Sequence, residues 1–251
     1  MTGVQTCALP ICRSVSARIS DSLDAATLGL YRDATPFLRN FLCKWPGPES
    51  DLYLHRDWMY IDEETSGART HVTWVPLVDV TLENGPLQVL PGSHRFDPSR
   101  RGTHLNGPWI QQRDVIVPRL VTVTARLGQA VVMDNALVHS SLPNRSDQPR
   151  LVAAVGMRPQ GQPLVHYLHT ATDDALRYDV DDEFFLRITP QALMAEPPDL
   201  PVAATVSGAQ LTIGPDDLGT ALDAVRPADP AESATRGRWW TRRLRRPRTV
   251  T

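Results

Sequence analysis

The sequence predicts a mainly β protein of the sandwich or barrel type, with helical segments at its flanks. Short segments rich in Val, Thr and Leu alternate with turn sequences from about residue 41 to residue 160. The helix–strand alternation typical of a doubly wound sheet is absent from the pattern. A chain of 251 residues is long enough for one sizeable domain with a buried core.

The first eleven residues, MTGVQTCALPI, resemble the translation of a sequencing adapter rather than natural protein. We therefore expect residues 1–11 to be non-native and the native chain to be cut short on its N-terminal side. Cys7 lies in this stretch and Cys12 at its boundary, which leaves Cys43 as the secure native cysteine. No disulfide framework is expected, and the default location is the cytoplasm.

The elements can be predicted in chain order. Residues 13–40 favour a helix, because Leu23, Leu28 and Tyr31 recur at helical spacing and Ser22 or Asp24 can cap it. Predicted strands follow, each bounded by turns: NFLCKW, LYLHRDW, THVTWVPLVDV, LQVL, AVVMDNALVHSS and RLVAAVGMRP. From about residue 196 the chain is rich in Pro and Ala, so we expect a loosely structured tail over residues 196–251, ending in an Arg-rich run.

The segment His55-Arg56-Asp57 is compatible with two chemistries. A protein-kinase catalytic loop needs an Asn five residues after its Asp, but position 62 is Asp62, and the other kinase motifs are missing. The alternative is a metal site. In a strand, His55 and Asp57 point to the same side and can both ligate one ion.

A metal site of this kind needs a third ligand, and His139 is the candidate. If AVVMDNALVHSS is one strand, then Met133, Asn135, Leu137 and His139 share a face. Two His and one carboxylate form the facial triad of non-haem iron oxygenases. Arg150, eleven residues further on, could lie in the same interior, where a buried guanidinium suits a dicarboxylic acid such as 2-oxoglutarate.

With NGPLQVLPGSH (residues 84–94) and HSSLPNRSDQPR (residues 139–150), these residues resemble the phytanoyl-CoA dioxygenase family of Fe(II)- and 2-oxoglutarate-dependent oxygenases over about residues 37–160. The resemblance implies a double-stranded β-helix, a cupin-like jelly roll. It also implies that His55, Asp57 and His139 bind iron and that Arg150 anchors 2-oxoglutarate. The Ser141 hydroxyl would assist in binding the carboxylate of this cosubstrate. The oxygenase domain would span residues 12–195.

The implied reaction consumes dioxygen and 2-oxoglutarate, hydroxylates an aliphatic carbon of a small organic molecule, and releases succinate and carbon dioxide. The resemblance also implies hydroxylation rather than halogenation, because relatives that halogenate have a small residue in place of the carboxylate that Asp57 provides here. Alternatives are a metal enzyme of the same architecture that does not use 2-oxoglutarate, and a non-catalytic barrel fragment. Neither nucleic acid nor a membrane-spanning segment is expected, and the sequence does not predict the oligomeric state.

Four further residues are weaker candidates. Thr73 and Asn135 could contact the cosubstrate, or could satisfy local backbone groups. Trp58 and Tyr60 directly follow the His-x-Asp pair and could line the substrate site, or could form a half-buried strand end.

Overall fold

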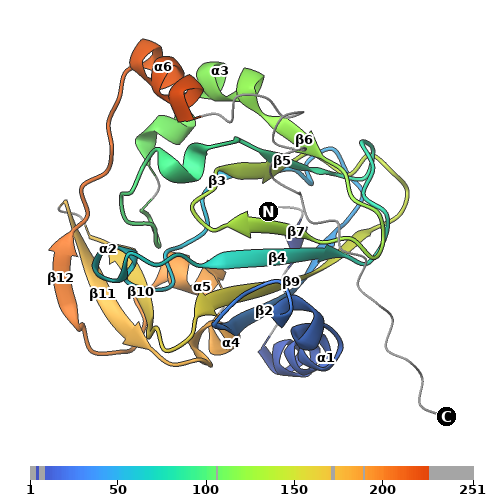
Figure 1. The fold of residues 1–251 in the computed structure, drawn as a ribbon, viewed down its shortest axis with the longest axis horizontal. Helices are drawn as coiled ribbons and strands as arrows, with labels where there is room; N and C mark the ends of the chain where they lie inside the picture. Colours follow the sequence, from blue (N-terminus) through green and yellow to red (C-terminus); the bar gives the residue numbers. More distant parts are fainter. Residues whose placement is uncertain (1–3, 6–8, 106, 171–172, 189, 226–251) are drawn as a thin grey trace.

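The computed structural model describes residues 4–5, 9–105, 107–170, 173–188 and 190–225. Two antiparallel sheets face each other and form a jelly roll, the double-stranded β-helix predicted from the sequence (Figure 1). The larger sheet has the strand order β1 (Val4–Gln5), β2 (Ala34–Lys44), β9 (Arg150–Pro159), β4 (His71–Pro76) and β7 (Val131–Asp134). The smaller sheet has the order β3 (Leu52–His55), β8 (His139–Ser141), β5 (Leu87–Val89) and β6 (Val121–Val123). That residues 1–11 are non-native stays a prediction.

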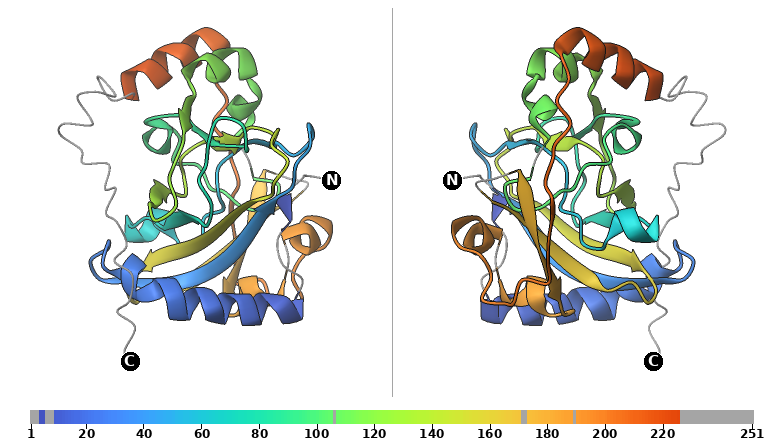
Figure 2. Two further views of the ribbon diagram at one scale, coloured as in Figure 1. Left: turned by 90° about the vertical axis from the view of Figure 1, so that its right-hand side faces the viewer. Right: turned by 90° about the vertical axis from the view of Figure 1, so that its left-hand side faces the viewer.

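The space between the two sheets is filled by apolar side chains from both. Val152 of β9 and Leu87 of β5 belong to this interior cluster, together with Trp74 of β4. On the outer face of β9, Ala153, Val155 and Met157 instead pack against the helix α1 (Leu9–Leu28), which runs across the larger sheet (Figure 2). Alternate residues of β9 therefore point into the barrel and away from it.

A third sheet of β10 (Leu164–His169), β11 (Asp174–Val180) and β12 (Ala204–Ser207) extends the molecule on one side (Figure 1). Short helical segments connect the strands: α2 (Glu63–Ser66), η1 (Ser93–Arg95), η2 (Pro108–Gln111), α3 (Arg113–Ile116), η3 (Val117–Arg119), α4 (Phe184–Arg187) and α5 (Pro190–Ala195). Of the helices in the described ranges, none is long and apolar enough to cross a membrane.

The C-terminal segment differs from the expected loose tail. β12 pairs with β11, and α6 (Pro215–Val225) buries Leu218 and Leu222 against a cluster that contains Trp109. These two Leu are four residues apart and so lie on one helix face, which covers the side of the smaller sheet that points away from the interior. The chain is thus packed as far as Val225, and the Arg-rich run near the end lies outside the described residues.

The predicted strand AVVMDNALVHSS is two strands in different sheets. The backbone N–H of Leu137 donates to the Asp134 carbonyl at 2.9 Å, and that of Ala136 donates to Asp134 Oδ1 at 2.7 Å. This turn carries the chain from β7 in the larger sheet to β8 in the smaller one. The prediction of one continuous strand face from Met133 to His139 is therefore wrong, because a local turn interrupts the alternation.

Candidate metal centre

His55, Asp57 and His139 lie together at one end of the smaller sheet. His55 ends β3 and is the cross-strand partner of His139, the first residue of β8, while Asp57 follows two residues after β3 ends. Asp57 Oδ1 is 3.9 Å from Nε2 of both His55 and His139. One donor atom from each residue lies within 4.8 Å of the others, so the three can hold a metal ion as a facial triad.

Backbone hydrogen bonds set the imidazoles for ligation. Nδ1 of His55 lies 2.8 Å from the Tyr53 carbonyl, and Nδ1 of His139 lies 2.9 Å from the Leu137 carbonyl. Since a carbonyl only accepts, each Nδ1 carries the proton and each Nε2 has a free lone pair. Burial, and then the nearby His139, lower the pKa of His55 to about 4, which keeps it in the neutral form that binds metals.

Arg150 begins β9 and points into the barrel, because it alternates with Val152 of the interior cluster. Its side chain is buried, its Nη1 donates to the Gly85 carbonyl at 2.6 Å, and its guanidinium lies 5.2 Å from the centre of the Trp74 ring. Nε has no hydrogen-bond partner, and no Asp or Glu in the described ranges forms an ion pair with Arg150. A buried cation without a carboxylate fits an anionic ligand.

Lys44 adds a second buried positive group beside Arg150, its cross-strand partner on β2. Its side chain is fully buried, and its ammonium donates to the carbonyls of Ser50 and Leu142. Burial and the charge of Arg150 lower the pKa of Lys44 to about 7. Within the described residues neither Lys44 nor Arg150 forms an ion pair, so this part of the barrel favours an anion such as a carboxylate, which would also favour the charged form of Lys44.

Arg150 is connected to the metal ligands through contacts with β5 and β8. Gly85, which accepts the Arg150 hydrogen bond, lies two residues before Leu87, and Leu87 pairs with Ser141 on β8. Ser141 shares its strand face with His139, two residues earlier. The Oγ of Ser141 is buried and has no hydrogen-bond partner among the described residues, so it is available to contact a ligand near Arg150.

Asn135 also remains a candidate for a ligand contact. It is buried directly after β7, and in the part of the chain that the structure describes its Oδ1 has no hydrogen-bond partner. Its backbone N–H is already bound to the Thr70 carbonyl at 3.1 Å, so the side chain is not needed for local backbone pairing.

The prediction for Thr73 is wrong. Thr73 hydrogen-bonds the hydroxyl of Tyr31, which packs among the α1-facing residues on the outer side of the larger sheet. Its neighbour Trp74 points into the barrel and stacks with Arg150. Sequence reasoning missed Trp74; an aromatic ring adjacent to Thr73 on the same strand was the available signal.

The two predicted substrate residues differ in their surroundings. Tyr60 is buried and packs against Phe37 and Phe185, with ring centres 4.9 and 5.0 Å apart, so it belongs to the core, and its contact with substrate stays a prediction. Burial, and then the charge of Asp57, raise the pKa of Tyr60. Trp58 is half-buried with its ring 5.2 Å from that of His166, and its contact with substrate stays a prediction.

Comparison with known proteins agrees with this site. The model of the family "Phytanoyl-CoA dioxygenase (PhyH)" matches residues 8–152, a range that contains the metal cluster and Arg150. A phytanoyl-CoA dioxygenase domain-containing protein 1 homolog from Dictyostelium discoideum is 30% identical over 146 residues, which cover 55% of this chain and 50% of that protein. The Danio rerio protein of the same description is 31% identical over 119 residues, which cover 45% of this chain and 40% of the relative.

The chain thus spans half or less of the length of these relatives. Among solved structures, the epimerase SnoN in complex with Fe3+, alpha ketoglutarate and nogalamycin RO is 22% identical, with a TM-score of 0.51 over 84% of this chain and 76% of that one. This similarity shows that the two chains share the jelly-roll fold. Since the family model matches more than half of the 251 residues, the chain belongs to the phytanoyl-CoA dioxygenase family.

Proposed function

We propose that this protein is an Fe(II)- and 2-oxoglutarate-dependent oxygenase that acts on a small organic molecule. The observation that carries the proposal is the His55, Asp57 and His139 cluster, with a buried Arg150 that lacks a carboxylate partner in the same barrel. When bound, iron with 2-oxoglutarate and dioxygen supplies the oxidising power to attack an unactivated C–H bond.

The residues of the chain would have separate tasks. His55, Asp57 and His139 would hold the ion on one face and leave the opposite face open. Arg150 would pair with the far carboxylate of 2-oxoglutarate, with the Ser141 hydroxyl donating to the same ligand. The apolar side chains between the sheets, such as Trp74 and Val152, would exclude water from this end of the barrel.

The finer proposal is that the reaction hydroxylates an aliphatic carbon. Asp57 supports it, because a third protein ligand occupies the position that a halide would otherwise take. The fold alone does not determine which reaction is catalysed, since one architecture can support several reactions.

The test is consumption of 2-oxoglutarate by the full chain with Fe(II) and a panel of small molecules, measured as succinate released. Arg150→Ala and His139→Ala should abolish release, whereas Arg126→Ala and His104→Ala, at exposed positions, should retain it. A product heavier by one oxygen atom supports hydroxylation, and a product of unchanged mass contradicts it. Iron-dependent turnover that persists in Arg150→Ala would favour the alternative metal enzyme that does not use 2-oxoglutarate.

A further inference from the structure

Asp57 differs from the other two ligands in how its backbone is held. His55 and His139 lie in paired strands, so the sheet fixes their orientation. Asp57 lies beyond the end of β3, and residues 56–62 belong to no helix or strand. Its carboxylate can face the two imidazoles only if other contacts hold this segment in place.

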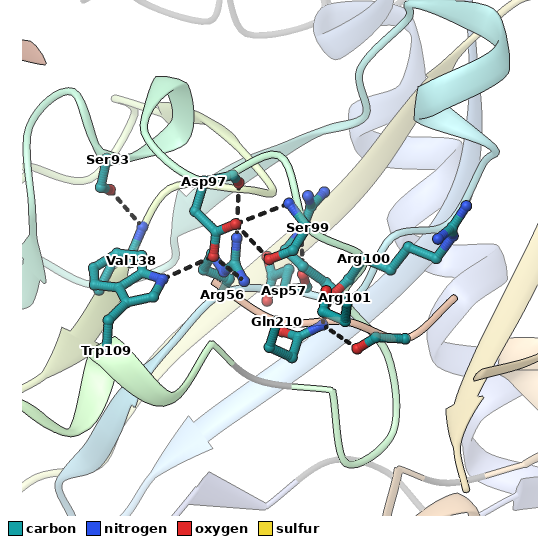
Figure 3. A network of polar contacts seen from close by, with 12 residues as sticks. Arg56, Asp57, Ser93, Asp97, Ser99, Arg100, Arg101, Trp109, Val138 and Gln210 are labelled. Carbon is teal, nitrogen blue, oxygen red and sulfur yellow. Dashed lines mark hydrogen bonds and ion pairs between the residues drawn. The ribbon is translucent and has the colours of Figure 1, made fainter. Parts of the chain in front are cut away.

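Arg56, between the two ligands, forms one such contact. Its side chain is fully buried with Asp97 and lies over the ring of Trp109, which belongs to the cluster under α6. Arg56 Nη2 lies 2.9 Å from Asp97 Oδ2, and Nη1 donates to the Asp97 carbonyl at 2.9 Å (Figure 3). Asp97 is itself fixed, because Trp109 Nε1 donates to Oδ2 at 2.7 Å and the Ser99 backbone N–H donates to Oδ1 at 2.8 Å.

Arg101 forms the second contact and acts on Asp57 itself. Its Nε donates to the backbone carbonyl of Asp57 at 3.1 Å, and its Nη2 lies 2.6 Å from Glu63 Oε1. The Arg101 carbonyl also accepts from the backbone N–H of Met59 at 3.0 Å. The Arg101 side chain is fully buried, so one side chain fixes the segment close to the ligand and at the start of α2.

Buried ion pairs of this kind contribute little net stability compared with apolar side chains of similar size. They do impose a defined geometry, because each charge must meet its partner. Groups that orient metal ligands typically change metal affinity by about 10- to 100-fold when they are replaced. A role in geometry therefore accounts better for two adjacent buried pairs at this segment than a role in stability alone.

We propose that Arg101, held by Glu63, and Arg56, held by Asp97, are positioning residues that fix Asp57 toward His55 and His139 before the metal binds. The proposal rests on the proposed metal site. The two proposals are distinct, because the positioning residues would touch no metal. The positioning proposal also predicts that residues 56–62 are already ordered in the metal-free protein.

The test is Co(II) binding to the full chain, followed by the d–d absorption spectrum, which reports ligand geometry without turnover. Arg101→Lys keeps the charge opposite Glu63 but loses the donor to the Asp57 carbonyl. It should weaken Co(II) binding by about 10-fold or more and alter the spectrum. The matched control is Arg119→Lys, at the exposed ion pair with Asp223, which should match the wild type in both respects. Unchanged affinity and spectrum in Arg101→Lys would overturn the proposal, while a wild type that binds no metal would overturn the metal site itself.

A second measurement tests whether the segment is ordered before metal binds, even if Arg101→Lys does not fold. Hydrogen exchange of the wild type reports directly on the Met59 amide, which is bonded to Arg101. The proposal predicts that this amide is protected without metal and changes little when Co(II) is added. Fast exchange of residues 57–62 that slows only with Co(II) would show that the ion orders the segment, and the proposal would fail.

Discussion

Replacing Arg150 by Met should abolish 2-oxoglutarate binding and leave the free energy of unfolding of the ligand-free protein nearly unchanged. Burial lowers the pKa of Arg150 to about 10 from 12.5, which at ~1.4 kcal/mol per pKa unit corresponds to about 3 kcal/mol for holding the charge inside. The hydrogen bond to the Gly85 carbonyl stabilises the folded protein by about 1.5–3 kcal/mol, and the contact with Trp74 by about 1 kcal/mol. These opposing contributions cancel to within about 1 kcal/mol.

Arg56 is the matched contrast for this prediction. It is equally buried but paired with Asp97, so Arg56→Met leaves a buried carboxylate without its cation and should cost about 3–5 kcal/mol. The assay is urea unfolding of each variant, with and without 2-oxoglutarate in anaerobic Fe(II). At ~100 times its Kd the ligand should stabilise the wild type by about 2.7 kcal/mol and Arg150→Met not at all. A loss of several kcal/mol in ligand-free Arg150→Met would contradict the balance of contributions at Arg150, and a retained ligand shift would contradict its role in binding 2-oxoglutarate.

Three further predictions concern other parts of the fold. Burial lowers the pKa of His166 to about 4 from 6.5, so as the pH falls His166 is protonated in the unfolded chain before it is protonated in the folded protein. The free energy of unfolding should therefore drop by about 3 kcal/mol between pH 6.5 and 4. Urea unfolding at pH 7.5 and 4.5 should show a smaller drop in His166→Phe. Thr73→Val should lower stability by about 1 kcal/mol through the lost bond to Tyr31 but leave the Kd for 2-oxoglutarate unchanged; a weaker Kd would return Thr73 to the cosubstrate site. Leu222→Ala should cost about 2–5 kcal/mol in thermal unfolding, and an unchanged Tm would contradict the packing of α6.

Much of the metal site could be predicted from the sequence, because the spacing of its residues is set by local structure. His55 and Asp57 are two apart, and the run from Asn84 to His94 is a continuous motif, so the spacing predicts strands and ligands without knowledge of distant contacts. The cluster of His55, Asp57 and His139 agrees with that prediction. His139 lies at the predicted site although a turn at Asp134 separates it from β7, so the pattern predicts the ligand but not the break between the two strands.

Local patterns predict least where both faces of an element are buried. Thr73, Trp74 and Val75 are all buried, so alternation of polar and apolar residues could not show which side chain enters the barrel. Tyr60 is covered by residues distant in sequence, including Phe185, and no local pattern reports such contacts. α6 was missed because the Pro- and Ala-rich composition around it resembles that of a tail, although Leu218 and Leu222 have helical spacing.

Under the proposed function, one barrel binds iron and 2-oxoglutarate together. The direct test is the visible absorption spectrum of the full chain, recorded anaerobically with Fe(II), with 2-oxoglutarate, and with both. A broad, weak band should appear only when both are present. It should be lost in His139→Ala, strongly reduced in Arg150→Ala and retained in His104→Ala. A folded, iron-loaded protein that shows no band with 2-oxoglutarate would contradict the proposed function.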